Sequence, residues 1–325
     1  MSNYIKKVAI VGASGTVGKF IAREIIKKGK QEVTAITRLD SQGKIPEGAK
    51  VAKVSYDDPA SLAKALEGHD ALIITMAVAA PPENQIKLIE AAAAANVSYV
   101  IPNQWGIESD HGTLGSDTLM STNINAARKK VEELGKSSWI AFVTGYWYSY
   151  SLSSKEAYGV DFKNRIMTFF DDGTQKINTI TWEKTGRAVA ALLSLPIKAE
   201  TAGAPSISDY KNKHVYTSSW LMSQKDMFAS VLKNTNTIES DWTIKHENST
   251  ERHTEAKKKL FAGDRSQFQR LLYARTFYPN DDGNFQSRHE LDDAKLGIEG
   301  EEDLDAATKL AIQFAETGNV YPRGE

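Results

Sequence analysis

The chain has 325 residues, 41% of them hydrophobic, so it can bury the core of one large domain or of two joined lobes. Its 40 basic and 41 acidic residues give a formal net charge of −1, which argues against a nucleic-acid binder that depends on a basic surface. It has no cysteine, which excludes disulfides and thiolate chemistry, and no apolar run of membrane-spanning length, so we expect a cytoplasmic protein without membrane partners.

The first 150 residues alternate between short β-branched runs and helical patterns. The predicted strands span residues 7–11, 32–37, 71–76, 99–102 and 139–143, and the predicted helices span 18–28, 59–66, 85–95 and 123–134. This alternation is typical of βαβ units, and strands that are apolar throughout indicate a parallel sheet covered on both faces. We therefore predict a doubly wound α/β domain over residues 1–150.

The pattern after residue 150 is less regular. It predicts helices over 185–193, 224–233 and 303–316, strands over 214–217 and 243–246, and a turn at 171–173. No repeat and no low-complexity linker marks a boundary. We expect residues 151–325 to form mostly a smaller α+β substrate lobe, interleaved with the sheet edge and packed over the carboxyl ends of the strands.

The first predicted strand ends in the glycine-rich sequence GASGTVG, residues 12–18, which opens the first helix. Gly12 allows the tight turn, Gly15 lets the backbone approach a pyrophosphate, and Gly18 lets the helix pack closely on the strand. The helix N-terminus then faces the phosphates, with hydroxyl donors added by Ser14 and Thr16. Because it stands between the strand and the helix of a βαβ unit, this sequence predicts the dinucleotide site of a Rossmann fold.

The end of the second strand decides which dinucleotide is expected. An acidic residue there binds the ribose 2′-hydroxyl of NAD, whereas arginine accepts the 2′-phosphate of NADP. The strand ends at Thr37 and is followed directly by Arg38, with Lys44 in the next loop. Asp40, an acidic residue that would favour NAD, lies two residues beyond Arg38. We expect NADP(H).

Further motifs extend over the whole chain. Beyond the glycine-rich turn with Thr37-Arg38, they occupy residues 56–62, 85–92, 143–148, 181–195 and 291–307 and, most specifically, the sequence VIPNQWG at 100–106. Together they resemble the NmrA-like, isoflavone-reductase-like branch of the atypical short-chain dehydrogenases, and its fungal members most of all. The resemblance implies an NADPH-dependent oxidoreductase that acts on a small aromatic, enone or polyketide-like metabolite.

The resemblance also implies residue roles. The dinucleotide would contact Gly12, Ser14, Gly15, Thr16, Val17, Gly18, Arg38, Asp57, Thr75, Met76, Ala77, Asn103 and Gly145, and the substrate would contact Gln104, Trp105, Tyr146, Trp147 and Tyr148. Aromatic residues expected at the pocket also include Phe169 and Phe170. An apolar lining of this kind suits a ring-shaped substrate.

The proton donor is harder to assign. No tyrosine has a lysine four residues later, as in classical short-chain dehydrogenases, and the lysine position of the related reductases falls on Thr122–Asn125, where neither Ile124 nor Asn125 transfers protons. The candidates are His111, in the loop after the strand at 99–102, and Tyr146 and Tyr148, which would point the same way on an extended backbone.

The missing lysine keeps two other functions open. One is a non-catalytic NADP(H)-sensing regulator, and the other is an NADP-bound isomerase or cyclase without net redox turnover. His246 and His253 lack the spacing and carboxylate frame of a metal site, so no metal is expected. A small molecule is the expected partner, and no oligomeric state is indicated.

Overall fold

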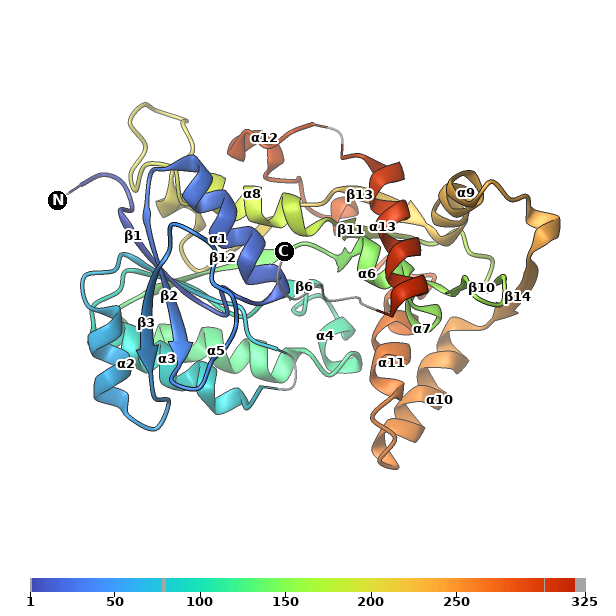
Figure 1. The fold of residues 1–325 in the computed structure, drawn as a ribbon, viewed down its shortest axis with the longest axis horizontal. Coiled ribbons are helices and arrows are strands. Elements are labelled where there is room, and N and C mark those ends of the chain that lie inside the picture. The colour runs from blue at the N-terminus through green and yellow to red at the C-terminus, as the bar shows by residue number, and fades with distance from the viewer. Residues whose placement is uncertain (1, 78–79, 301, 319–325) are drawn as a thin grey trace.

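The computed structural model describes residues 2–77, 80–300 and 302–318 (Figure 1). Its largest sheet has the order β12-β7-β5-β4-β1-β2-β3, with β6 paired to β7, and all its pairs are parallel. The strands are β1 (Lys7–Val11), β2 (Glu32–Arg38), β3 (Lys50–Val54), β4 (Ala71–Ile74), β5 (Tyr99–Ile101), β6 (Trp105–Gly106), β7 (Ser138–Val143) and β12 (Lys213–Tyr216). The predicted parallel sheet is confirmed.

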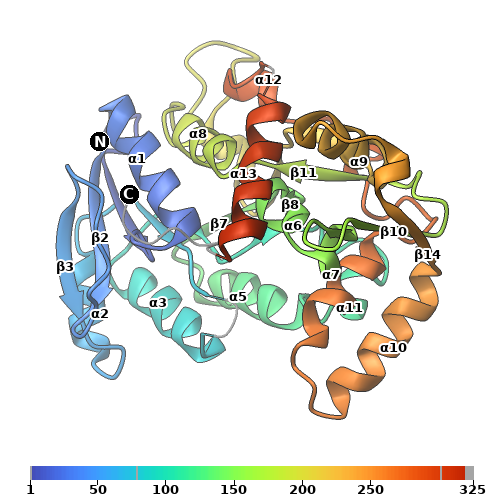
Figure 2. The ribbon, with the colours of Figure 1, turned by 45° about the vertical axis from the view of Figure 1, so that its right-hand side comes forward.

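Helices cover both faces of this sheet (Figures 1 and 2). On one face lie α1 (Thr16–Lys28) and α8 (Trp182–Leu192), and on the other lie α2 (Pro59–Leu66), α3 (Pro82–Ala94) and α5 (Ser121–Leu134). The start of α2 shows how local sequence sets these bounds: the Asp58 side chain accepts hydrogen bonds from the amides of Ala60 and Ser61, and Pro59 occupies the first turn.

The chain order in the sheet reverses between β1 and β4. From β1 the chain continues through β2 to β3 on one side, whereas β4, β5 and β7 follow on the other. In open α/β sheets a crevice forms at such a reversal, outside the carboxyl ends of the strands, and ligands bind there. Because the glycine-rich turn follows β1 directly, it lies at the edge of this crevice.

The rest of the chain builds a second lobe and also completes the first. It adds β12 and α8 to the main layers, and it forms two three-stranded sheets, β14-β10-β9 and β13-β11-β8. These contain β8 (Tyr146–Trp147), β9 (Val160–Asp161), β10 (Ile166–Phe170), β11 (Lys176–Ile180), β13 (Trp220–Ser223) and β14 (Thr243–Glu247). The division at residue 150 stays a prediction.

The helices of the second lobe pack around a core of their own. They are α6 (Tyr148–Leu152), α7 (Lys155–Tyr158), α9 (Gln224–Thr235), α10 (Ser249–Phe261), α11 (Gln267–Thr276) and α13 (Leu304–Thr317). Figure 2 shows α13 passing beside α6, while the hairpin of α10 and α11 extends from the lobe. The short helices α4 (Leu114–Asp117) and α12 (Asp293–Leu296) connect the layers. No helix in the described part of the chain is long and apolar enough to span a membrane.

Candidate functional site

The glycine-rich turn has the geometry of a phosphate cradle. Gly12 has a φ of +82°, and a Cβ there would lie 1.9 Å from the carbonyl oxygen of Thr75. A Cβ on Gly18 would lie 2.1 Å from the carbonyl oxygen of Gly12, so both positions require glycine. Gly15 precedes α1, and no side chain caps the first amides of this helix. These amides are therefore available to an anion.

A cavity of about 1990 Å³ crosses the carboxyl ends of the strands. Its lining begins with Arg38 at the end of β2 and Tyr56 after β3 and passes the glycine-rich turn. It continues to Asn103 after β5 and on to Trp147 and Tyr273 of the second lobe. Pockets for one small ligand typically have about 300–1,000 Å³. The cavity therefore has room for a dinucleotide and a second ligand.

Side-chain hydrogen bonds fix the middle of the cavity. The Asn103 side chain accepts a bond from the amide of Met76 at 3.0 Å and donates one to the Met76 carbonyl oxygen at 3.1 Å. Gln85 accepts from the amide of Asn103 at 2.7 Å, and the indole of Trp105 donates to the Ile74 carbonyl oxygen at 3.0 Å. The segments after β4 and β5 are thus joined where the nicotinamide is expected.

Most of the predicted site residues lie in the cavity wall. These are Gly12, Ser14, Gly15, Thr16, Val17, Gly18, Arg38, Thr75, Met76, Ala77, Asn103, Gln104, Trp105, Gly145, Tyr146 and Trp147. Asp57 is not among them, because its side chain is 95% exposed and pairs with Lys87 at 3.3 Å, and its neighbour Tyr56 lines the cavity instead. The contacts that these residues make with ligands stay predictions.

The three candidate proton donors are not brought together. Tyr148 is fully buried, its hydroxyl lies 2.9 Å from Thr308 Oγ1, and burial raises its pKa to about 12. His111 contacts Asp282 at 3.1 Å and is not part of the cavity lining. Tyr146 does line the cavity, and its hydroxyl contacts Thr276. The placement of Tyr148 and His111 argues against their direct contact with substrate.

The backbone explains the difference between Tyr146 and Tyr148. An extended chain would turn both side chains the same way, but the extended segment β8 ends at Trp147 and α6 begins at Tyr148. The helix turns Tyr148 toward α13 and into the core. The aromatic residues Phe169 and Phe170 also belong to the core, on β10, and do not line the cavity. Their predicted place at the pocket was wrong.

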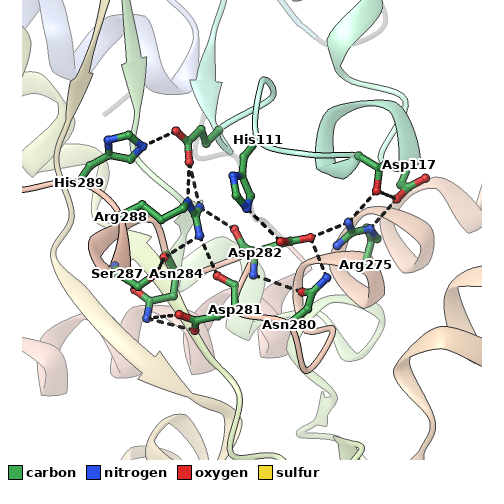
Figure 3. Close-up of polar contacts among 12 residues, drawn as sticks. His111, Asp117, Arg275, Asn280, Asp281, Asp282, Asn284, Ser287, Arg288 and His289 are labelled. Atoms are coloured by element: carbon green, nitrogen blue, oxygen red, sulfur yellow. Dashed lines mark hydrogen bonds and ion pairs between the residues drawn. The ribbon is translucent and has the colours of Figure 1, made fainter.

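A network of polar and charged side chains joins the loop after β6 to residues 275–289 (Figure 3). Glu108, which follows the cavity residue Ile107, accepts hydrogen bonds from Arg288 at 2.9 Å and from Tyr216 at 2.9 Å, and it contacts His289 at 2.6 Å. The residues that meet here come from the loop after β6, from β12 and from residues 281–289. The network therefore fixes the loop that carries Ile107.

A second part of the same network holds α11 in place. Arg275 donates hydrogen bonds to Asp117 at 2.8 Å and to Asp282 at 2.6 Å, and Asp282 also contacts His111 (Figure 3). The next residue, Thr276, contacts the hydroxyl of Tyr146 at 2.7 Å. The position of the α11 wall thus depends on Arg275.

These carboxylates predict a loss of stability in acid. Although burial opposes ionisation, hydrogen bonds from Arg288 and Tyr216 hold the pKa of Glu108 below its ordinary value. A carboxyl group with a lowered pKa in the folded state stabilises the fold above the pKa of the unfolded chain, about 4.3 for glutamate, and loses this contribution as the pH falls further. We expect Glu108→Gln to unfold more easily than the wild type in urea at pH 7.

The pH dependence of the unfolding free energy shows whether the charge of Glu108 or only its shape stabilises the fold. Below about pH 4 the wild-type carboxyl group takes up a proton and resembles the amide of Glu108→Gln. The difference in unfolding free energy between the two proteins should therefore shrink as the pH is lowered from 6 to 3. A difference that stays constant over this range would show that the ionised carboxylate contributes nothing.

Several cavity residues were missed in the sequence. They are Tyr56, Tyr150, Phe268, Gln269, Leu272 and Tyr273. Four of them lie on α11, a helix that the apolar pattern did not predict. Ile124, within the segment Thr122–Asn125 where the resemblance implies a lysine, also lines the cavity. Within the described residues, no three His, Asp or Glu side chains gather as a metal ion would need.

Sequence comparisons relate the chain to NAD(P)H-binding proteins and to a fungal oxidoreductase. Residues 12–143 match the family model for NAD(P)H-binding domains. The chain is 25% identical to oxidoreductase aprR of Aspergillus flavus over 263 residues, which cover 79% of this chain and 82% of that protein.

Solved structures show the same fold over nearly the whole chain. The structure of AtPrR2 with NADP⁺ and (+)-pinoresinol has a TM-score of 0.74 at 18% identity and covers 95% of this chain and 99% of its own. The crystal structure of isoflavone reductase has a TM-score of 0.72 at 17% identity, with coverages of 94% and 98%. The predicted Rossmann fold is thereby confirmed. Residues 12–143 form an NAD(P)H-binding domain, in a chain with the fold of AtPrR2 and isoflavone reductase.

Proposed function

We propose that the protein is an NADPH-dependent oxidoreductase that reduces a small aromatic, enone or polyketide-like metabolite in the cytoplasm. The observation that carries the proposal is one continuous cavity, which joins the glycine-rich turn and Arg38 to an apolar, aromatic end. The first part suits a dinucleotide and the second a ring-shaped substrate. AtPrR2, which shares the fold, is solved with NADP⁺ and an aromatic ligand together.

In this proposal the two parts of the chain have different tasks. Residues 1–150 bind the dinucleotide, and residues 151–325 mostly enclose the substrate, with α11 as a wall. The short helix α6, which crosses the division at residue 150, adds Tyr150 to that wall. NADPH supplies a hydride when it is bound. The protein orients the two ligands and excludes water from the aromatic end, where Trp105, Trp147 and Leu272 line the cavity.

The preference for NADPH over NADH is tested at Arg38. Its side chain lines the cavity, is 68% exposed and lies 3.5 Å from Asp40. A charge-assisted contact with the 2′-phosphate contributes about 1.5–3 kcal/mol, so Arg38→Ala should weaken NADPH binding by this amount and leave NADH binding unchanged. Titration calorimetry with both dinucleotides measures this.

The matched control is Asp40→Asn. It removes the carboxylate that competes with the phosphate for Arg38, so NADPH binding should stay the same or become tighter. Equal affinities for NADPH and NADH in the wild type would contradict the proposed selectivity.

The reductase activity is tested by NADPH consumption. We expect absorbance at 340 nm to fall when the protein is mixed with NADPH and a panel of enones and quinones. The presence of Ile124 where related reductases have lysine favours a second candidate, a regulator that binds NADP(H) without turnover. Tight NADPH binding without consumption across the panel would support the regulator.

A further inference from the structure

Three tyrosine side chains line the aromatic end of the cavity: Tyr146, Tyr150 and Tyr273. The Tyr146 hydroxyl contacts Thr276 Oγ1 at 2.7 Å, and the Tyr273 hydroxyl contacts Ser151 Oγ at 2.6 Å. Both side chains are buried, and burial raises the pKa of both phenols. Because a raised pKa makes a phenol a weaker acid, these two are poor proton donors.

Tyr150 lies on the opposite side of α6 from Tyr148. Successive residues of a helix are about 100° apart, so two positions along the helix turn the side chain by about 200°. Tyr148 packs into the core against Trp220 and contacts Thr308. Tyr150 therefore faces away from that core, and its half-buried side chain lines the cavity.

Tyr150 shares the cavity wall with the other two phenols. Tyr146 and Tyr273 stack with their ring centroids 4.1 Å apart. After burial, which is the main cause, electrostatic repulsion from neighbouring phenols including Tyr150 raises the pKa of Tyr273. The half-buried phenol of Tyr150 thus stands beside the aromatic wall at the substrate end.

Charged groups are confined to the other end of the cavity. Every charged side chain among the described lining residues belongs to α1 or to residues 38–47, where the phosphates and the adenosine are expected. At the substrate end, the cavity residue from the segment where the resemblance implies a lysine, Thr122–Asn125, is Ile124, which cannot donate a proton. Among the described lining residues at that end, the titratable side chains are the three tyrosines, and Tyr150 is the one that is only half buried.

We propose that Tyr150 is the proton donor of the reduction, a role that rests on the oxidoreductase activity proposed above. The substrate carbon receives a hydride from NADPH, which becomes NADP⁺, and the electron pair of the reduced bond moves onto the substrate oxygen. Tyr150 donates its phenolic proton to that oxygen and regains a proton from water. One proton is taken from solvent for each turnover.

The variant Tyr150→Phe tests this role, with trans-chalcone as an enone probe. Removal of the hydroxyl should lower kcat by about 100-fold or more, because a positioned general acid typically contributes about 10²–10⁴-fold. NADPH affinity and the unfolding midpoint should stay as in the wild type.

A quinone probe separates proton donation from packing. Hydride transfer to menadione yields a phenolate-type anion, whose conjugate acid has a pKa of about 10, so it needs an acid far less than an enolate does. Tyr150→Phe should therefore keep most of its menadione reductase activity. Equal losses with both probes would show that the ring is needed for packing and would overturn the role as donor.

Tyr278→Phe is the matched control. Tyr278 is also half buried and hydrogen-bonded, to His253 at 2.9 Å, but it does not line the cavity. It should keep wild-type kcat. Wild-type turnover of trans-chalcone by Tyr150→Phe would overturn the role of Tyr150 alone. A wild-type protein that binds NADPH but reduces neither probe would overturn the oxidoreductase proposal, and this role with it.

Discussion

Gly15→Val is expected to abolish NADPH binding while the protein still folds. At Gly15 the backbone has φ −77° and ψ 169°, an extended conformation that valine adopts readily. A Cβ there would meet the Gly12 carbonyl oxygen at 3.1 Å, which calls for a small local shift. The branched side chain would, however, stand where the pyrophosphate must approach the first amides of α1.

We expect NADPH affinity to fall by about 100-fold or more, equal to about 2.8 kcal/mol. Titration calorimetry gives the affinity, and circular dichroism with urea unfolding reports on the fold. Gly12→Val is the contrasting variant, because its positive φ and the 1.9 Å approach to Thr75 should damage the fold itself. Normal NADPH binding by a folded Gly15→Val protein would show that the cradle lies elsewhere.

The part of the chain that is expected to bind the dinucleotide could be predicted because its local sequence patterns agree with one another. An apolar strand, three glycines at fixed spacing and an amphipathic helix all indicate the same βαβ unit, and the structure has β1, the turn and α1 in that order. The strand β3 was missed because it lies at the sheet edge. Its residues Lys50 and Val51 are exposed, and only Val54 is fully buried, so it lacks the apolar run of a central strand.

The hairpin of α10 and α11 was missed for a different reason. Ion pairs rather than a regular apolar stripe hold it to the lobe: Arg252 and Arg270 both pair with Glu156 on α7 and with Glu247 on β14. Ion pairs of this kind, whose partners lie between 5 and 114 positions apart, leave no periodic apolar signal in the sequence. Because α11 supplies one wall of the cavity, much of the substrate end could not be predicted.

Tyr150 was missed because the backbone conformation of this segment was predicted wrongly. The interpretation of residues 146–148 as extended chain led to Tyr148, whereas the switch to helix at Tyr148 brings Tyr150 to the cavity instead. A five-residue helix is too short to show the spacing of 3 and 4 that indicates a helix in sequence. The sequence therefore predicted the segment that reaches the cavity, but it placed Tyr148 there and missed Tyr150.

Arg275→Met is expected to destabilise the protein and to loosen the α11 wall. Arg275 is 2% exposed and pairs with Asp117 and Asp282, whose side chains are 29% and 12% exposed. Removing one partner of a buried pair leaves a charge without compensation, at a cost of about 3–5 kcal/mol. We expect the lower end of that range, because Asp117 keeps access to water.

The control variant is Lys129→Met, which breaks an exposed helical pair with Glu133. An exposed pair of this kind contributes about 0.3–0.5 kcal/mol, so its unfolding midpoint in urea should hardly move. Arg275→Met should in addition raise KM for the substrate probe more than it changes NADPH affinity. Its neighbour Thr276 contacts the hydroxyl of Tyr146, which lies in the substrate wall and not beside the phosphates. A loss of less than about 1 kcal/mol, as for surface pairs, would show that water compensates Asp117 and Asp282 and that packing alone positions α11.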